Sequence, residues 1–147
     1  QDFDNKAHDG FTGHSYLAPF VNLGAMTTNS NLKNTYGLIR LKTSFWSADT
    51  NMDKFGFVVG PHSKFGIGSL ISTGSLLGGH SNMAAGGRFL PKHLDHFSWV
   101  EGDTTTTNRY DSAMKVAQIV ASRRNETYSA AEKRRALSVY KRVYKPT

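Results

Sequence analysis

The chain has 147 residues, of which 38% are hydrophobic, a formal net charge of +7 and no cysteine. This length is enough for one domain with its own core. The lack of Cys excludes disulfides and thiolate metal sites and leads us to expect a cytoplasmic protein. No apolar run approaches the ~18 residues of a membrane span, so we expect no membrane-spanning or secretory segment.

A six-residue repeat organises most of the first hundred residues. From Val59 the pattern apolar, small, any, any, small, any recurs five times in frame, and three earlier units precede it. The units begin at Phe11, Leu17, Leu23, Val59, Phe65, Ile71, Leu77 and Met83. A spacing of six fits neither an amphipathic helix nor an alternating strand, although chance spacing in a Gly/Ser-rich loop region is the competing interpretation. Three units per turn would give a triangular coil of about eighteen residues, so we predict a mainly β fold, a parallel β-helix.

The predicted β-helix spans residues 1–100 and is interrupted once. Residues 29–58 break the six-residue frame, so we expect an extruded loop there, with a hairpin and with Phe45 and Trp46 packed on something. Residues 89–100 are predicted to cap the open end of the coil. In the coils themselves, Val59 should lie under Leu77 and His62 under His80, one turn of the coil apart.

The C-terminal part is predicted to be helical and basic. Residues 101–107 are expected to be a linker to a helical extension over 108–147, with helices from about Asn108 to Arg124 and from about Ser129 to Tyr144. The second helix would begin with a capping box from Ser129 to Glu132. Residues 1–108 hold eight Lys/Arg and eight Asp/Glu, whereas 109–147 hold ten and three. A solvated helix face explains such a charge run most simply, and a phosphate-bearing ligand or an acidic neighbouring subunit is the alternative.

Two motif-rich stretches carry a resemblance to a known family. The stretch from Asn5 to Tyr16 reads NKAHDGFTGHSY, and the stretch from Val21 to Asn34 reads VNLGAMTTNSNLKN. They resemble the acetyltransferase β-helix of the bifunctional N-acetylglucosamine-1-phosphate uridylyltransferase / glucosamine-1-phosphate acetyltransferase. They are more similar still to bacterial sugar nucleotidyltransferases of that type. The resemblance covers residues 4 to about 125. It implies a left-handed coil, a homotrimer, and a nucleotidyltransferase domain preceding this chain in a longer protein.

The same resemblance implies roles for individual residues. A gapless match places His8 on the general base and Asn31 on the residue that orients the reacting groups. It places Asn22 on a substrate-binding position, with Lys33 as a further candidate for a phosphate. Acetyl-CoA, the acyl donor, would contact Ala25, Thr27 and Ala85, and no metal is required. The chain departs from the family at Phe11, where a sugar-phosphate-binding Tyr is expected, and at Ile67, where a small Ser meets acyl-CoA.

Several of these residues have simpler explanations. His8 is equally suited to an exposed coil edge, and Asn29, Asn31 and Asn34 tolerate the left-handed backbone of turns. His62 and His80 are more typical of corner positions than of a metal site between subunits, because two imidazoles alone leave a site incomplete. His93 and His96 are assigned to the cap. The GIGS stretch at Gly66 lacks the Lys and the strand-to-helix context of a phosphate loop.

The sequence therefore favours an acyl-CoA-dependent N-acyltransferase that acts on an amino-sugar phosphate or a nucleotide sugar. The alternative is a non-catalytic β-helix that trimerises and regulates an attached nucleotidyltransferase, and fold alone does not separate the two. Nucleic-acid binding by the basic helices is the least favoured hypothesis, because the body of the protein is neutral.

Overall fold

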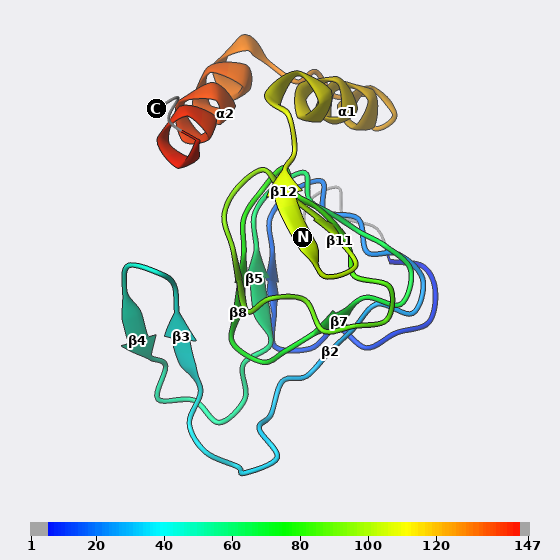
Figure 1. The fold of residues 1–147 in the computed structure, drawn as a ribbon. Coiled ribbons are helices and arrows are strands. Elements are labelled where there is room, and N and C mark those ends of the chain that lie inside the picture. The colour runs from blue at the N-terminus through cyan, green and yellow to red at the C-terminus, as the bar shows by residue number, and fades with distance from the viewer. Residues whose placement is uncertain (1–5, 145–147) are drawn as a thin grey trace.

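The computed structural model describes residues 6–144, in which short strands precede two helices (Figure 1). The strands are β1 (Tyr16–Leu17), β2 (Thr28–Asn29), β3 (Arg40–Lys42), β4 (Ser47–Asp49), β5 (Phe57–Val59), β6 (Lys64–Phe65), β7 (Leu70–Ile71), β8 (Ser75–Leu77), β9 (Asn82–Ala84), β10 (His93–Leu94), β11 (Ser98–Glu101) and β12 (Thr104–Thr107). The helices are α1 (Tyr110–Ser122) and α2 (Ala130–Val143).

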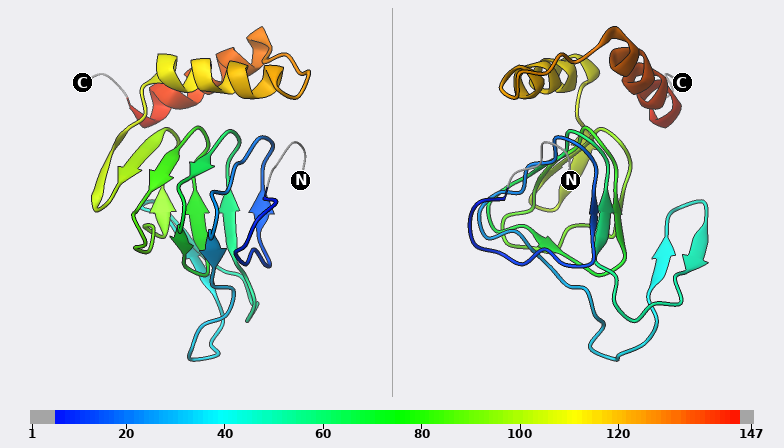
Figure 2. Two further views of the ribbon diagram at one scale, coloured as in Figure 1. Left: turned by 90° about the vertical axis from the view of Figure 1, so that its right-hand side faces the viewer. Right: turned by 180° about the vertical axis from the view of Figure 1, so that it is seen from behind.

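The strands form three stacks around a triangular coil, seen end-on in Figure 1 and from the side in Figure 2. The stacks are β1-β5-β8-β10, β6-β9-β11-β12 and β2-β7, and the pairings between successive coils are parallel. Val59 pairs with Leu77, as the repeat predicts, and Lys64 pairs with Asn82. The leading apolar residues of the units fill the interior, where Val59, Ile71 and Met83 are fully buried. The predicted β-rich fold with short parallel strands and a C-terminal helical pair is therefore confirmed.

One corner of the triangle is built from four stacked rings. Phe20, His62, His80 and Phe97 adopt left-handed φ values between 57° and 63°. This backbone conformation turns the chain sharply and is uncommon for residues other than Gly. Successive ring centroids lie 4.8, 5.1 and 4.9 Å apart, with planes within 12° of parallel. We call these four rings the corner column. The predicted stacking of His62 and His80 is thus confirmed.

The extruded loop is shorter than the predicted 29–58. Asn29 belongs to β2 and Phe57 to β5, so both lie within the stacks. Tyr16 pairs with Val58, which is 42 residues further along, whereas the pairs between β5 and β8 are 18 apart. This difference of 24 residues is the insertion, and it closes where Phe55 N donates to Asn31 O at 2.9 Å. The predicted hairpin is β3–β4, which projects beside the coil (Figure 1).

Two further boundaries need correction. Residues 89–100 are not a separate cap but continue the stacks, because His93 pairs with Leu76 and Trp99 with Asn82 in parallel register. Residues 101–107 are not a plain linker. The four threonines 104–107 form β12, antiparallel to β11, as β-branched residues favour on an exposed sheet edge.

The helical pair begins and ends within two residues of the predicted positions. Ser129 Oγ accepts from Glu132 N at 3.2 Å while Glu132 Oε2 accepts from Ser129 N at 2.7 Å, so the predicted capping box is present. Met114 and Ala117 of α1 and Ala136 of α2 pack with Phe97 in a second apolar cluster. The helices consequently pack on the corner column, and Figure 2 shows them above one corner of the triangle. Neither helix is long and apolar enough to cross a membrane.

Candidate functional site

His14 and Asn31 lie together where the extruded loop leaves the coil. Asn31 follows β2, and His14 precedes β1 with a left-handed φ of 52°. His14 Nδ1 is 2.8 Å from Asn31 Nδ2, and the imidazole is exposed. Both backbones are tied to the returning end of the loop, since Gly56 N donates to His14 O at 2.7 Å and Phe55 N donates to Asn31 O. The pair is therefore an exposed imidazole oriented by an amide.

The orientation of the Asn31 amide decides what this imidazole can do. With Nδ2 toward the ring, Nδ1 accepts the hydrogen bond and the ring proton sits on Nε2. With the amide turned over, Nδ1–H donates to Oδ1, and Nε2 carries the lone pair that a general base needs. Asparagine supports either tautomer, so the pair can orient an accessible imidazole with Nε2 directed to take up a proton.

The structure does not bring His8 to Asn31. His8 lies on an exposed turn, where Lys6 Nζ donates to its backbone oxygen at 2.7 Å. The neighbouring Asp9 O accepts from Met26 N, which places this segment beside residues 26 and 27 rather than beside Asn31. Within residues 6–144, no hydrogen bond or ion pair of the His8 imidazole is found.

Lys33 and the three predicted acyl-CoA contacts offer little side-chain surface. Lys33 Nζ donates to Leu38 O within the extruded loop. Thr27 and Ala85 are buried at 1% and 2% exposure, Ala85 inside the main core, and Ala25 is half-buried. If these positions touch a thioester, they would do so through their backbone.

Asn22 lines a cavity of about 480 Å³ between the coil and the end of α1. It bridges to Lys64 of β6, whose Nζ donates to Phe20 O at 2.7 Å. The remaining lining residues are Phe20, Val21, Val120, Arg123 and Arg124. Asn22 therefore lies on the β6 face of the triangle, while Asn31 follows the β2 face. Within one copy of the chain, these two predicted substrate residues thus lie on different faces.

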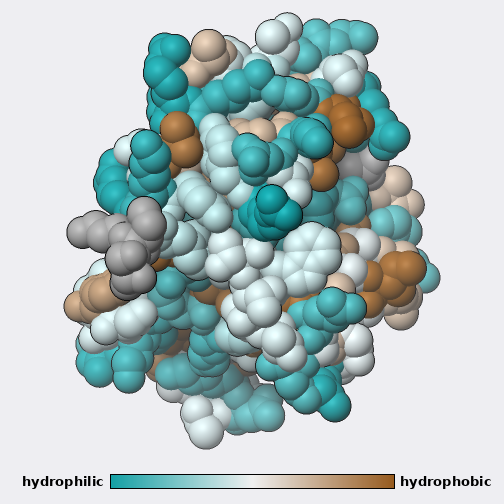
Figure 3. Space-filling view, turned by 45° about the horizontal axis from the view of Figure 1, so that its top comes forward, coloured by the Kyte–Doolittle hydropathy of each residue, from teal (hydrophilic) through white to brown (hydrophobic). Residues whose placement is uncertain are grey.

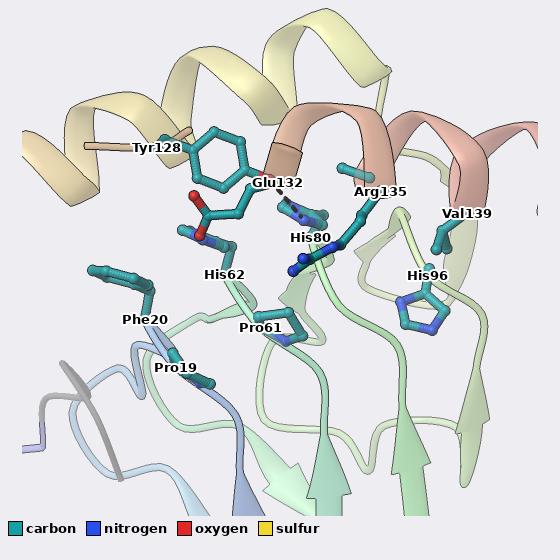
Figure 4. Close-up of a pocket in the computed structure, with 11 residues that line it drawn as sticks. Pro19, Phe20, Pro61, His62, His80, His96, Tyr128, Glu132, Arg135 and Val139 are labelled. Carbon is teal, nitrogen blue, oxygen red and sulfur yellow. Dashed lines mark hydrogen bonds between the residues drawn. The ribbon is translucent and has the colours of Figure 1, made fainter. Parts of the chain in front are cut away.

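A second cavity, of about 310 Å³, opens between the corner column and α2 (Figure 4). Phe20, His62 and His80 form one side, with Glu132 and Arg135 projecting from α2 opposite them. Tyr128 crosses the top of the rings, with its hydroxyl 3.4 Å from His80 Nε2. Nδ1 of His62 and Nδ1 of His80 are buried without a hydrogen-bond partner.

These two buried histidines are poorly suited to acid–base chemistry near neutral pH. Burial, assisted by Lys64, lowers the pKa of His62 to about 4, and burial beside His62 lowers the pKa of His80 to about 3. Both rings are neutral and weakly basic at pH 7, far from the matched pKa that a general base requires. No group of three or more potential metal ligands occurs among the residues described, 6–144.

Sequence reasoning missed His14, Arg123 and Arg124. The signal for His14 was present, since it precedes Asn31 by 17 residues, one fewer than the coil period. No such signal exists for the arginines, because their position depends on how α1 docks on the coil. They belong to the basic excess of residues 109–147, which lies on the largely hydrophilic helical side of the molecule (Figure 3).

No protein-family model matches this chain, and a search of curated proteins gives no match either.

Proposed function

We propose that the chain is an acyl-CoA-dependent N-acyltransferase, built on a left-handed parallel β-helix, that acts on an amino-sugar phosphate or a nucleotide sugar in the cytoplasm. Acetyl-CoA is the expected donor. The observation that carries the proposal is the exposed His14 imidazole held 2.8 Å from the Asn31 amide. His14 takes the role of base in this proposal, and His8, the candidate from the sequence, is tested beside it.

The reaction needs one proton acceptor and one polarised carbonyl. The amino group of the sugar attacks the thioester carbon, a C–N bond forms, the C–S bond breaks, and CoA leaves as its thiolate. His14 Nε2 accepts the proton that the nitrogen loses and passes it to the departing thiolate, so that CoA is released as the thiol. A backbone N–H near Ala25 would stabilise the charge on the thioester oxygen.

A homotrimer completes the site in this proposal. His14 and Asn31 lie where the chain enters β1 and leaves β2, whereas Asn22 lies beside β6, so substrate bound by all three would have to span two copies. The surface supports self-association: Tyr16 is 63% exposed on the β1 strand, and Phe45 at the tip of the hairpin is 87% exposed. Such exposed aromatics are typical of interface residues.

The test is acetyl-CoA binding by calorimetry, followed by thiol release with glucosamine-1-phosphate. We expect wild type to bind and turn over, and His14→Ala to bind but lose turnover by about 100-fold or more, the size of a general-base contribution. His8→Ala is the matched control and should keep turnover. If His8→Ala lost turnover and His14→Ala kept it, His8 would be the base, as the motif predicts.

A non-catalytic, regulatory β-helix is the second candidate. It is favoured by Ile67, which projects at 76% exposure from the turn between β6 and β7, and by Thr27 and Ala85, whose side chains are buried. A projecting Ile where the resembled enzyme has a small residue would obstruct an acyl-CoA groove. In this case wild type would show no acetyl-CoA binding, and Ile67→Ser would restore it.

A further inference from the structure

A buried amide beside the candidate base has no role in the mechanism so far. Asn29 is 5% exposed, ends β2 and precedes Asn31 by two residues. Its Oδ1 accepts from Gly13 N at 2.9 Å, and its Nδ2 donates to Gly13 O at 3.1 Å and to Ser30 O at 3.0 Å. Gly13 directly precedes His14, so this side chain holds the backbone from which the imidazole projects. We call this arrangement the Asn29 clamp.

The orientation of the Asn29 amide is fixed by its partners, unlike that of Asn31. Turning it over would set Nδ2 against Gly13 N, both of them donors, and Oδ1 against two carbonyl oxygens. Releasing the clamp would leave buried polar groups unpaired, which costs more than the hydrogen bonds themselves contribute. Asn29 lies in a strand, so a left-handed turn does not explain the choice of Asn at this position.

Other contacts close the same corner from the side of β5. Ser15 Oγ donates to Gly13 O at 2.9 Å and accepts from Phe57 N at 3.1 Å. Gly56 packs so closely that a Cβ there would collide with Gly13 O and Ser15 Oγ, which only glycine avoids. Its N–H donates to His14 O at 2.7 Å. The returning end of the extruded loop therefore leaves the clamp little room to relax.

One short segment, residues 29–31, holds both the backbone and the ring of His14. Asn29 fixes the backbone through Gly13, and Asn31 meets the imidazole at 2.8 Å. The φ of His14 is 52°, a left-handed value that a residue other than Gly keeps where the surrounding structure enforces it. Without the clamp, the backbone at His14 would be free to relax, and the imidazole would move relative to Asn31.

We propose that Asn29 is a positioning residue for the His14–Asn31 pair, acting through Gly13 rather than by contact with substrate. This inference rests on the proposed acyl transfer and adds a residue that neither the six-residue repeat nor the motif match assigns. Displacing a catalytic group by about 1 Å can lower a rate about 100-fold, because the reacting atoms must be aligned. Loss of the clamp should therefore lower kcat more than it weakens substrate binding.

Thiol release by the full chain gives the first readout. Asn29→Ala should lower kcat about tenfold or more with little change in KM for acetyl-CoA. Asn29→Ser keeps one hydroxyl near Gly13 and should show a smaller fall, which serves if the alanine variant does not fold. Ser81→Ala is the matched control, because Ser81 is 1% exposed and its Oγ accepts from Ser98 N of the next coil at 3.1 Å. It loses a buried contact between coils far along the chain from His14 and should keep its kcat.

A double-mutant cycle separates positioning from a general loss of stability. If Asn29 acts by holding His14 against Asn31, Asn29→Ala should lower kcat little further when Asn31→Leu is already present. Two losses that simply multiply would mean that Asn29 acts independently of the pair, and the inference would be wrong. It would also be wrong if Asn29→Ala kept the full kcat of an active wild type.

A spectroscopic readout decides the same question without turnover. The nitrogen chemical shifts of the His14 ring, assigned by comparison with His14→Ala, report the hydrogen bond at Nδ1. In Asn29→Ala these shifts should move toward those of Asn31→Leu, whereas Ser81→Ala should leave them as in wild type. Unchanged ring shifts in Asn29→Ala would overturn the positioning role whether or not the wild type turns over. A wild type without turnover, with ring shifts that do move, would instead overturn the acyltransferase proposal alone.

Discussion

At the scale of single residues, the histidines of this protein divide by environment. His14 is exposed and meets an amide, whereas His62 and His80 are buried in the corner column with one unpartnered nitrogen each. A ring that remains neutral because it is buried stabilises the fold by packing, and a ring at the surface is available for proton transfer. The two environments lead to two different predictions.

Substitutions at Asn31 test the coupling of His14 to Asn31. In Asn31→Asp the carboxylate can still accept from Nδ1–H, which leaves Nε2 available to take up the proton, so this variant should keep measurable turnover. Asn31→Leu removes the group that orients the ring and should lower kcat about tenfold or more with little change in KM. Thiol release measures both variants. An unchanged kcat in Asn31→Leu would show that Asn31 does not position the base.

The pH dependence of stability tests the buried pair. In the unfolded chain a histidine has a pKa near 6.5, but in the fold His62 titrates at about 4 and His80 at about 3. Stability is thus fully present above pH 6.5 and is lost as the pH falls, because the unfolded state then binds protons that the fold rejects. Between its folded and unfolded pKa values, each histidine lowers the free energy of unfolding by at most about 1.4 kcal/mol per pH unit.

His62→Phe replaces one histidine of the corner column by a third phenylalanine, which keeps an aromatic ring in the stack and removes one titrating group. We expect its free energy of unfolding in urea to fall less steeply than that of wild type between pH 6.5 and pH 4.5. Subtracting one slope from the other cancels the pH dependence that comes from the carboxylates common to both proteins. Equal slopes would mean that His62 is hydrated and protonated in the fold.

At the scale of elements, the helical pair is joined to the coil by aromatic contacts. Tyr128 meets His62 edge-on with ring centroids 5.0 Å apart, and Tyr140 meets Phe97 in the same way at 5.0 Å. Tyr144 Oη also donates to Phe97 O at 3.2 Å. Edge-to-face pairs add stability beyond the area they bury, so the column that turns the coil also docks the helices.

The start of α2 should be sensitive to its cap. Ser129→Ala removes the acceptor for Glu132 N and should destabilise α2 by about 1 kcal/mol, whereas Ser129→Thr should be nearly neutral. Hydrogen exchange of the α2 amides measures this locally. Faster exchange throughout the coil as well would show that coil and helices unfold as one unit.

At the scale of the whole molecule, the coil is a short stack whose hairpin reaches away from the core. Figure 2 shows β3–β4 standing to one side of the triangle, at the end of the loop that leaves the coil. A short solenoid buries little surface for its length, so burial between copies is the expected way to gain more. The hairpin, with its exposed aromatic tip, is the natural place for such a contact.

The proposed trimer gives the corresponding prediction. Phe45→Ser/Trp46→Ser should shift the assembly toward monomer in light-scattering chromatography, with the dissociation constant raised about tenfold or more if these rings are buried anchors. Val116→Ser, on the exposed face of α1, is the control and should leave the mass unchanged. A wild-type protein that is monomeric at all concentrations would contradict the trimer.

Sequence alone determined two kinds of feature in this protein: the repeating coils, and the helix cap that depends only on neighbouring residues. The six-residue period predicts that Val59 pairs with Leu77 and His62 stacks on His80, because each coil repeats the same short-range geometry. The capping box at Ser129 is equally local. The loop boundaries and the strand at 104–107 were missed because both depend on pairing partners distant in sequence or across a turn.

Tertiary structure alone decided which residues form the candidate sites. His14 reaches Asn31 only once the first two coils stack, and Arg123 and Arg124 reach Asn22 and Lys64 only once α1 docks on the corner column. No periodic pattern encodes the docking of a helix on a coil, because docking depends on how complementary the two surfaces are. The sequence therefore predicts the scaffold, and the packing of its non-repeating parts decides where chemistry can take place.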